Sequence, residues 1–302
     1  MIQAKELSKR YGGTVAVDGL TFDVRPGHVT GFLGPNGSGK STTLRMALGL
    51  DLPTAGAVTV NGRPYRRLPR PLHEVGALLD ANAVHGGRSA YHHLLALAQS
   101  NRIGRRRVGE VLDLVGLAAV AGQRVGGFSL GMRQRLGIAA ALLGDPGVLM
   151  LDEPVNGLDP EGIRWIRGLL RSLAAEGRTV FVSSHLMSEM AQTADHLVVI
   201  GKGRLIADRS LTEFVQATGT GQVLVRTPDP DRLATALGGE ARVTAEPDGA
   251  LLVAGLNAAR VGEAAAAAGV VLHELTPRAS LEEAFMELTA DAVEYTTTGG
   301  NR

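Results

Sequence analysis

The chain of 302 residues contains no cysteine, and its positive and negative charges nearly cancel. Without cysteine the protein forms no disulfide, which agrees with a reducing compartment. A formal net charge of +1 at pH 7 produces no global field that would attract nucleic acid. The short basic run Arg105-Arg106-Arg107 is interpreted as a solvated helix face, with a polyanion site as the alternative. The composition therefore gives no support to a nucleic-acid partner.

Long hydrophobic runs are missing as well. The longest apolar stretch, from Leu136 to Leu151, is interrupted by Gly144-Asp145-Pro146 and is too short to span a bilayer. The N-terminus lacks the apolar core of a signal peptide. If membrane transport is the task of this chain, another polypeptide must supply the channel. The length suffices for one large α/β domain and a small second domain.

A glycine-rich segment joins a predicted buried strand, Val29 to Leu33, to a predicted helix that includes Leu44 to Leu48. Glycines can adopt positive φ there, so that successive N–H groups and the helix N-terminus converge on one anion. Lys40 then reaches the β- and γ-phosphates, and the Ser41 hydroxyl is placed to ligate Mg²⁺. A turn without a ligand is the alternative, but strand, helix and Lys-Ser pair together predict a nucleotide site. It comprises Gly34, Pro35, Asn36, Gly37, Ser38, Gly39, Lys40, Ser41 and Thr42.

Two carboxylates follow another apolar run further along the chain. The run from Gly147 to Leu151 is predicted to be a strand buried on both faces, and Asp152 and Glu153 stand at its carboxyl end, where ligands of open α/β sheets collect. Asp152 suits Mg²⁺ or its water shell. Glu153 lies outside the strand and is free to orient and deprotonate an attacking water. Helix capping is the alternative role of this pair, but the pattern favours hydrolysis of a γ-phosphate.

Further motifs surround these residues in a fixed order. Phe128 to Met132 precedes the carboxylates, Leu158-Asp159 follows them, and Thr179 to Ser184 is predicted to be another buried strand, followed by His185. From residue 1 to about 215, this ordered set resembles the ATP-binding subunit of ATP-binding-cassette (ABC) transporters. The resemblance implies a P-loop NTPase fold of the α/β class with an inserted helical subdomain.

The resemblance also implies roles for named positions. The family's motifs match at Gly34 to Thr42 (Walker A), Phe128 to Met132 (signature loop), Leu149 to Glu153 (Walker B), Leu158-Asp159 (D-loop) and His185 (switch histidine). The implied catalytic residues are Lys40, Glu153 and His185; Tyr11, Asp80, Ser129, Gly131 and Asp159 are implied at ATP, and Ser41, Asp152 and Asp80 at Mg²⁺. Tyr11 matches the position whose ring stacks on adenine, although by itself it could equally be an ordinary strand-end aromatic.

The sequence departs from the family pattern in two places. The signature consensus Leu-Ser-Gly-Gly-Gln is Phe128-Ser129-Leu130-Gly131-Met132 here, so that Leu130 restricts φ and Met132 removes an amide. Asp80 stands where the family usually carries glutamine; it can accept from metal-bound water but cannot donate, and capping of a turn is its alternative role. Both substitutions resemble those in the branch of ABC subunits that serves bacterial drug and antibiotic export or self-resistance.

Around the motifs, the pattern predicts three further features of an ATP-binding domain at residues 1–218. Ile2 to Leu7 and Leu20 to Val24 are expected as edge strands of an antiparallel layer, and a helical arm is expected at about 88–130. His196 to Ala207 is expected to form a hairpin, in which His196 has no evident partner and is structural.

Gly219-Thr220-Gly221 marks a domain boundary. Beyond it, residues 219–290 are expected to form a small α+β domain, because their segments alternate as β, α, β, β, α, β, α, the order of a split βαβ fold. The predicted segments are Val223 to Arg226, Asp231 to Leu237, Arg242 to Ala245, Ala250 to Val253, Ala258 to Ala268, Val270 to Leu275 and Ser280 to Leu288. Asn257 is a predicted N-cap, Ser280 begins a predicted capping box, and residues 291–302 are expected to be a disordered tail.

The resemblance implies that two copies sandwich two ATP molecules head to tail and that a separately encoded transmembrane permease is the partner, at the cytoplasmic face of the membrane. The expected function is the ATP-hydrolysing subunit of an exporter of drugs, antibiotics or other small molecules, without a nucleic-acid partner. The alternative is a soluble ABC ATPase that acts on nucleic acid or ribosomes. Such proteins usually carry two cassettes, coiled-coil insertions or zinc ligands, which this sequence lacks.

Overall fold

The computed structural model describes residues 1–217, 221–279 and 285. It divides the chain into two compact units, Met1–Arg209 and Ser210–Leu288. The second unit begins at Ser210, several residues before the glycine-rich boundary that the sequence predicts. Residues 219 and 220 of that boundary lie outside the described residues, as do the predicted tail and, apart from Phe285, the predicted last helix with its capping box.

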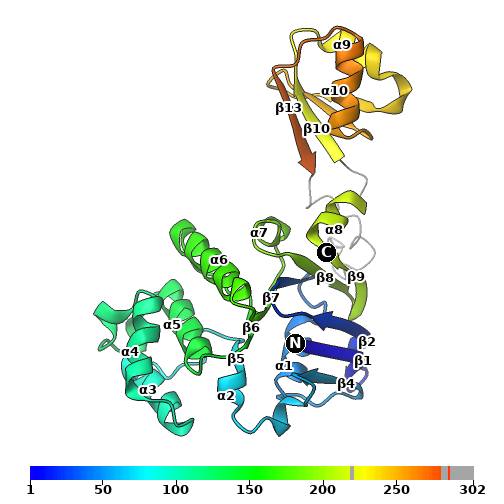
Figure 1. The fold of residues 1–302 in the computed structure, drawn as a ribbon. Helices are drawn as coiled ribbons and strands as arrows, with labels where there is room; N and C mark the ends of the chain where they lie inside the picture. Colours follow the sequence, from blue (N-terminus) through cyan, green and yellow to red (C-terminus); the bar gives the residue numbers. More distant parts are fainter. Residues whose placement is uncertain (218–220, 280–284, 286–302) are drawn as a thin grey trace, which may run out of the picture. The chain divides into compact units, whose positions relative to one another are not determined.

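A six-stranded sheet with the order β5-β6-β7-β3-β8-β9 forms the centre of the first unit (Figure 1). Its strands are β3 (Val29–Leu33), β5 (Val75–Leu78), β6 (Val148–Asp152), β7 (Thr179–Ser184), β8 (His196–Gly201) and β9 (Arg204–Ser210). The first five strands of this order run parallel, and β3 and β7 are buried along their whole length. A parallel sheet covered on both faces needs no polar alternation, which is why continuous apolar runs predict its strands correctly.

A three-stranded antiparallel sheet with the order β2-β1-β4 lies against this centre. It consists of β1 (Ile2–Tyr11), β2 (Thr14–Val24) and β4 (Ala55–Val60). The prediction that β1 is an edge strand is wrong, because β4 pairs with its second side. Phe22 of β2 contacts Phe32 of β3 and Phe181 of β7, with ring centroids 5.7 and 5.8 Å apart. These rings join the two sheets in one hydrophobic core.

The inserted helical arm is built from α3 (Ala90–Ser100), α4 (Arg105–Leu114) and α5 (Leu130–Leu142). Figure 1 shows these helices packed together at the side of the unit remote from the three-stranded sheet. Arg105 and Arg106 at the start of α4 are exposed, as predicted, whereas Arg107 donates to the Leu142 carbonyl at the end of α5. α5 packs against β5, which brings the signature loop at the start of α5 to the central sheet.

The described residues of the first unit contain four more α-helices. They are α1 (Lys40–Ala47), α2 (Pro71–Glu74), α6 (Pro160–Ala175) and α7 (Met187–Ala191). α6 has a complete set of start and stop signals: Asp159 accepts a hydrogen bond from the Gly162 N–H, Pro160 stands at the first helical position, and Gly177 follows at φ +89°.

The second unit contains α8 (Leu211–Ala217) and a four-stranded antiparallel sheet with the order β11-β12-β10-β13. The elements after α8 are β10 (Gly221–Arg226), α9 (Pro230–Leu237), β11 (Arg242–Ala245), β12 (Leu251–Ala254), α10 (Ala258–Ala267) and β13 (Glu274–Ala279). This is the predicted split βαβ order. The last strand begins four residues later than predicted, since Val270 packs into the core as part of the connection. Asn257 accepts from the Arg260 N–H at 2.9 Å, so its prediction as an N-cap is confirmed.

Candidate functional site

The order of the central sheet brings the predicted site residues together. β6, β7 and β3 are parallel neighbours, so their carboxyl ends meet at one edge of the sheet. Glu153 follows β6, His185 follows β7, and the glycine-rich segment Gly34 to Thr42, here called the phosphate loop, follows β3. Three segments that are far apart in the sequence therefore converge on one site.

The phosphate loop requires glycine on two different physical grounds, positive φ and close approach of neighbouring atoms. Gly37 and Gly39 adopt φ of +80° and +104°, as the sequence predicts. Gly34 does not have a positive φ; a Cβ there would lie 2.4 Å from Ser38 Oγ and 2.5 Å from the Ile200 carbonyl. Among the described residues the buried Ser38 hydroxyl has no hydrogen-bond partner. α1 begins at Lys40, so the free N–H groups of its first turn stand directly at the loop.

Lys40 is 6% exposed and lies inside this loop. Its ammonium donates to the carbonyls of Gly34 at 2.6 Å and Pro35 at 3.2 Å, and it lies 3.9 Å from Glu153 Oε1. Burial lowers the pKa of Lys40, and the charges of Glu153 and Asp152 oppose that shift. The ammonium is thus held inside the loop by oxygen atoms of the chain itself.

The two carboxylates after β6 have different surroundings. Asp152 is the last residue of β6, is paired in register with Ser183 and accepts a hydrogen bond from the Ser183 hydroxyl. The Glu153 carboxylate is 19% exposed and lies 2.9 Å from His185 Nδ1. Neither acid caps a helix, since Asp159 caps the next one. Lys40, Glu153 and His185, the three predicted catalytic residues, therefore meet in one place.

Tyr11, the predicted adenine platform, is the last residue of β1 and is 47% exposed. Its hydroxyl donates to Asp51 Oδ2 at 2.8 Å, and Arg45 donates to the same carboxylate at 2.7 Å. The Lys9 ammonium lies 4.9 Å from the centroid of the Tyr11 ring, within range of a cation–π interaction. Burial and the hydrogen bond to Asp51 raise the pKa of Tyr11. The hydroxyl is thus anchored while the ring remains accessible.

The signature loop adapts to its unusual residues without backbone strain. Ser129 is the N-cap of α5, and its hydroxyl accepts from the Met132 N–H at 3.2 Å. Leu130 and Gly131 already belong to the helix, and neither has a positive φ. The expected restriction of φ by Leu130 therefore has no cost in this structure. Gly131 packs closely instead, because a Cβ there would lie 2.9 Å from the Gly157 carbonyl.

Two predicted ligands of the nucleotide or the metal make local contacts. Asp80 is exposed after β5, and its Oδ1 accepts from the Asn82 N–H at 2.8 Å, which is the turn-capping role considered as its alternative. Asp159 is exposed and uses Oδ1 to cap α6. Contacts of these two residues with metal or ATP remain predictions.

The comparison with known proteins decides the family. A family model described as ABC transporter matches residues 17–156. The bacitracin transport ATP-binding protein BcrA of Bacillus licheniformis is 43% identical over 211 residues, which cover 69% of this chain and 69% of that protein. The chain belongs to the ABC transporter family. It is an ATP-binding subunit of the ATP-hydrolysing kind, as the order of its motifs predicts.

Other similarities extend along this ATPase subunit. The Nod factor export ATP-binding protein I of Burkholderia pseudomallei (strain 1710b) is 35% identical over 294 residues, covering 95% of this chain and 96% of that protein. A solved ATP-binding cassette, described as a dimeric post-hydrolysis state bound to ADP and Pi, is 25% identical with a TM-score of 0.64 and covers 70% of this chain and 99% of its own. A domain of unknown function, DUF8746, matches residues 221–282.

Sequence reasoning missed three residues that shape the ATPase site: Gln134, Ser183 and Asp51. Gln134 is 4% exposed and donates to the Glu153 carbonyl at 3.2 Å. Ser183 binds both the Asp152 carboxylate and the Glu153 N–H. Asp51 anchors Tyr11. For Ser183 a signal was present, since it is a polar residue at the end of an apolar run. Gln134 stands between two arginines and Asp51 between two leucines, and neither pattern indicates the contact that the residue makes.

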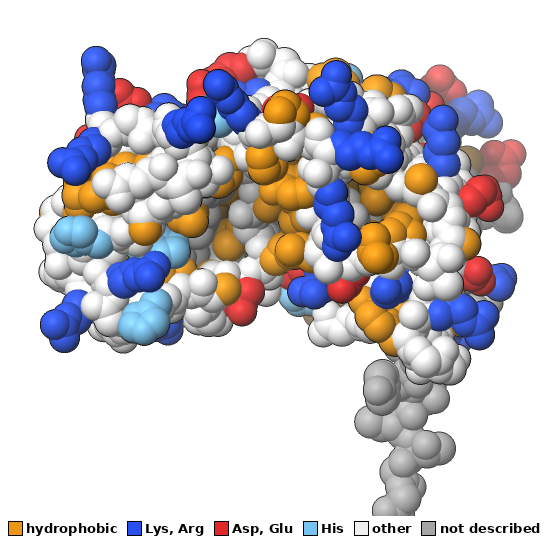
Figure 2. Space-filling model, turned by 90° about the horizontal axis from the view of Figure 1, so that it is seen from below, with side chains coloured by type: hydrophobic (Ala, Val, Ile, Leu, Met, Phe, Trp, Pro, Cys, Tyr) orange, Lys and Arg blue, Asp and Glu red, His pale blue; other side chains and the backbone are white. Residues whose placement is uncertain are grey.

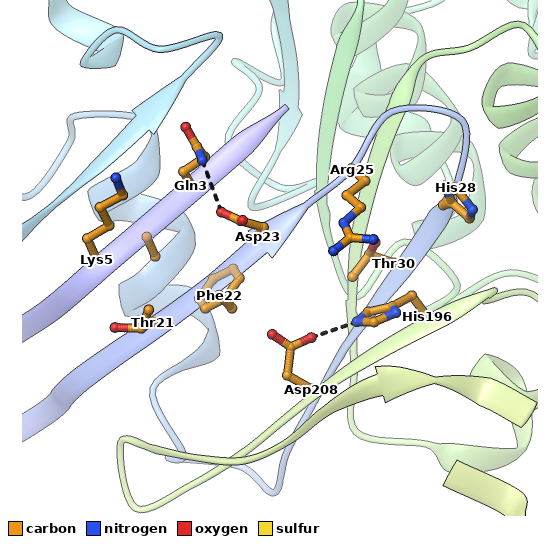
Figure 3. A pocket seen from close by; sticks show the side chains of 11 residues that line it. Gln3, Lys5, Thr21, Phe22, Asp23, Arg25, His28, Thr30, His196 and Asp208 are labelled. Carbon is orange, nitrogen blue, oxygen red and sulfur yellow. Dashed lines mark hydrogen bonds and ion pairs between the residues drawn. The ribbon is translucent and has the colours of Figure 1, made fainter. Parts of the chain in front are cut away.

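A cavity of about 530 Å³ in the first unit does not belong to this site. Figure 3 shows side chains from β1, β2, β3, β8 and β9 around it. Thr30 of β3 and His196 of β8, which are register partners, line it near the amino ends of their strands, opposite to the end that carries the phosphate loop. His196 Nε2 lies 2.6 Å from Asp208 Oδ1, so the prediction that His196 has no partner is wrong.

Proposed function

We propose that this ATPase acts as a homodimer on the cytoplasmic face of a membrane and energises a separately encoded permease that exports an antibiotic or a similar small molecule. The observation that carries the hydrolytic part is the contact of Glu153 with His185 at 2.9 Å and with Lys40 at 3.9 Å, beside the phosphate loop. Relatives named for bacitracin transport and Nod factor export support a transporter rather than a soluble ATPase acting on nucleic acid or ribosomes.

In the proposed dimer, the phosphate loop of one copy faces Ser129 and Gly131 of the other. Loop N–H groups and Lys40 hold the β- and γ-phosphates. Glu153 accepts the proton of the attacking water, and His185 orients the carboxylate through its second oxygen. A dimeric cassette bound to ADP and Pi among the solved relatives supports this assembly.

Mg²⁺ is the metal that we propose for this site. The donors fit a hard cation, since Ser41 places an exposed hydroxyl at the start of α1 and Asp152 offers carboxylate oxygens. The described part of the chain contains no cluster of three or more His, Cys, Asp or Glu side chains suited to a metal. One or two protein oxygens with substrate phosphates are the usual set for Mg²⁺, which then neutralises charge on the phosphates.

One face of the surface is suited to a protein partner. Within the described residues, no helix combines the length and the apolar character needed to cross a bilayer. Figure 2 shows one face of the molecule on which hydrophobic side chains gather in a hollow, with Lys and Arg side chains around it. A concentrated apolar patch with a polar rim is typical of a protein interface.

Glu153→Gln tests the hydrolytic part of the proposal. The exchange keeps the size of the side chain and removes the base, so ATP hydrolysis should fall about 10²- to 10⁴-fold while ATP binding persists. With ATP and Mg²⁺, the variant should elute as a dimer in size-exclusion chromatography. Glu246→Gln, in β11's connection within the second unit, is the matched control and should hydrolyse ATP as wild type does. An ATPase rate within about threefold of wild type would exclude Glu153 as the base.

Export is tested in vesicles that contain the chain together with its permease. We expect bacitracin or a related peptide antibiotic to stimulate the ATPase activity of the reconstituted complex. The compound should accumulate on the side of the vesicle membrane opposite to the ATPase subunit. A complex that hydrolyses ATP but neither responds to nor moves any such compound would contradict the export substrate and leave the ATPase assignment intact.

A further inference from the structure

The backbone of Glu153 is held in an uncommon conformation. Its φ is +49°, in the left-handed region that side-chain-bearing residues rarely occupy. Residues in this region persist when the surrounding structure fixes them, and they concentrate at functional sites. The contacts on either side of the Glu153 Cα therefore decide whether its carboxylate stays near Lys40 and His185.

Hydrogen bonds fix both peptide groups that flank Glu153. Its N–H donates to Ser183 Oγ at 3.0 Å, and its carbonyl accepts from Gln134 Nε2 at 3.2 Å. Each peptide group is planar, so holding the N–H on one side and the carbonyl on the other fixes φ and ψ together. Those two angles determine the direction of the Cα–Cβ bond and hence where the carboxylate can reach.

The Gln134 side chain is buried and binds the Glu153 carbonyl instead of solvent. It is 4% exposed in the middle of α5, and glutamine is seldom buried without a hydrogen-bond partner. It follows Ser129, the N-cap of α5, by five residues, which is about 7.5 Å along a helix. The helix that begins at the signature loop thus touches the residue that our proposal makes the catalytic base.

We propose that Gln134 is a positioning residue that holds Glu153 in its left-handed conformation and ties the signature helix α5 to the base of the same subunit. The inference rests on the proposed function, because it requires Glu153 to be the base. Ser183 supports the same conformation from β7, but it also contacts Asp152. Gln134 contacts Glu153 through the backbone carbonyl. A substitution of Gln134 therefore tests the position of Glu153 without removing a proposed ligand of metal or phosphate.

The test is Gln134→Met in the full-length protein, which keeps the side-chain length and removes the amide donor. A displaced catalytic group commonly costs up to about 10²-fold, so kcat should fall about 10- to 100-fold, while the Kd for ATP by calorimetry stays within about twofold of wild type. Gln99→Met, an exposed glutamine of α3, is the matched control and should leave kcat unchanged. In the Glu153→Gln background, Gln134→Met should cause no further loss, because it acts through the carboxylate that is already absent.

The outcomes separate this inference from the proposed function. Full activity of Glu153→Gln would refute the base itself. A large loss in Glu153→Gln with normal kcat in Gln134→Met would overturn the positioning role alone, as would multiplicative losses in the double variant or a parallel loss of ATP affinity. If Gln134→Met does not fold, as judged by circular dichroism and thermal unfolding, Gln134→Asn replaces it, since it keeps the amide but is one methylene too short; its kcat must then fall at unchanged ATP affinity.

Discussion

Removing the Tyr11 ring should weaken ATP binding because the contact with adenine is lost, while the contacts with the phosphates remain. The ring stands at the end of β1, almost half exposed, with its hydroxyl fixed by Asp51 and the Lys9 ammonium 4.9 Å from its centroid. These contacts hold the ring in place and leave its face free to stack on adenine. Adenine is uncharged and the Tyr11 hydroxyl is already bound to Asp51, so stacking is the interaction that the ring can supply.

The size of the effect follows from stacking energies. Stacking of one base on an aromatic side chain contributes about 1–3 kcal/mol, so Tyr11→Ala should raise the Kd for ATP about 5- to 150-fold. Tyr11→Phe keeps the ring and removes only the hydrogen bond to Asp51. That hydrogen bond orders the ring without touching ATP, so its loss should cost less than loss of the ring, at most about 1.5 kcal/mol or about a 13-fold rise in Kd.

Calorimetry with two ligands separates the contribution of adenine to the binding affinity from that of the phosphates. ATP and tripolyphosphate are titrated into wild type, Tyr11→Ala and Tyr11→Phe, with Tyr91→Ala in the helical arm as a control. We expect the tripolyphosphate affinity to be the same in all four proteins. If Tyr11→Ala weakens tripolyphosphate as strongly as ATP, or leaves the ATP affinity unchanged, Tyr11 is an ordinary strand-end aromatic and the stacking role is refuted.

Two further predictions concern the phosphate loop and the loop after β5. Lys40→Ala should raise the Kd for ATP about 10- to 150-fold, because a hydrogen bond to a charged group contributes about 1.5–3 kcal/mol; an unchanged Kd by calorimetry would contradict its contact with the β- and γ-phosphates. Asp80→Gln should leave the ATP affinity nearly unchanged but alter the stimulation of ATPase activity by the permease in vesicles. Equal stimulation of the variant and wild type would instead favour the turn-capping contact with Asn82 as the whole role of Asp80.

The central sheet and its site were predictable because their signals are local. Buried parallel strands are continuous apolar runs, and two of the predicted catalytic residues follow directly after such strands, Glu153 after β6 and His185 after β7. Pairing of β1 with β4 was not predictable, because β4 begins with the small residues Ala55, Gly56 and Ala57 and carries little of the strand pattern. Strand pairing depends on what the rest of the fold brings alongside.

The signature loop illustrates a different limit. From the sequence, Leu130 in place of glycine suggests a restricted backbone, since only glycine adopts positive φ freely. The restriction has no effect, because α5 already begins at Leu130 and the residue needs only a helical conformation. A residue pattern shows which conformations are costly, but the position of a helix start decides whether any of them is needed.

The residues that support the site were the hardest to predict, because their partners are chosen by topology. Gln134 binds a backbone carbonyl, which carries no mark in the sequence, and the two atoms meet only because α5 packs beside the end of β6. Asp51 lies in the connection between α1 and β4 and binds Tyr11, which is 40 residues away in the sequence. A motif therefore identifies the groups that we propose to bind the nucleotide, whereas the groups that position them must be found from the fold, where a buried polar side chain such as Gln134 is visible only after folding.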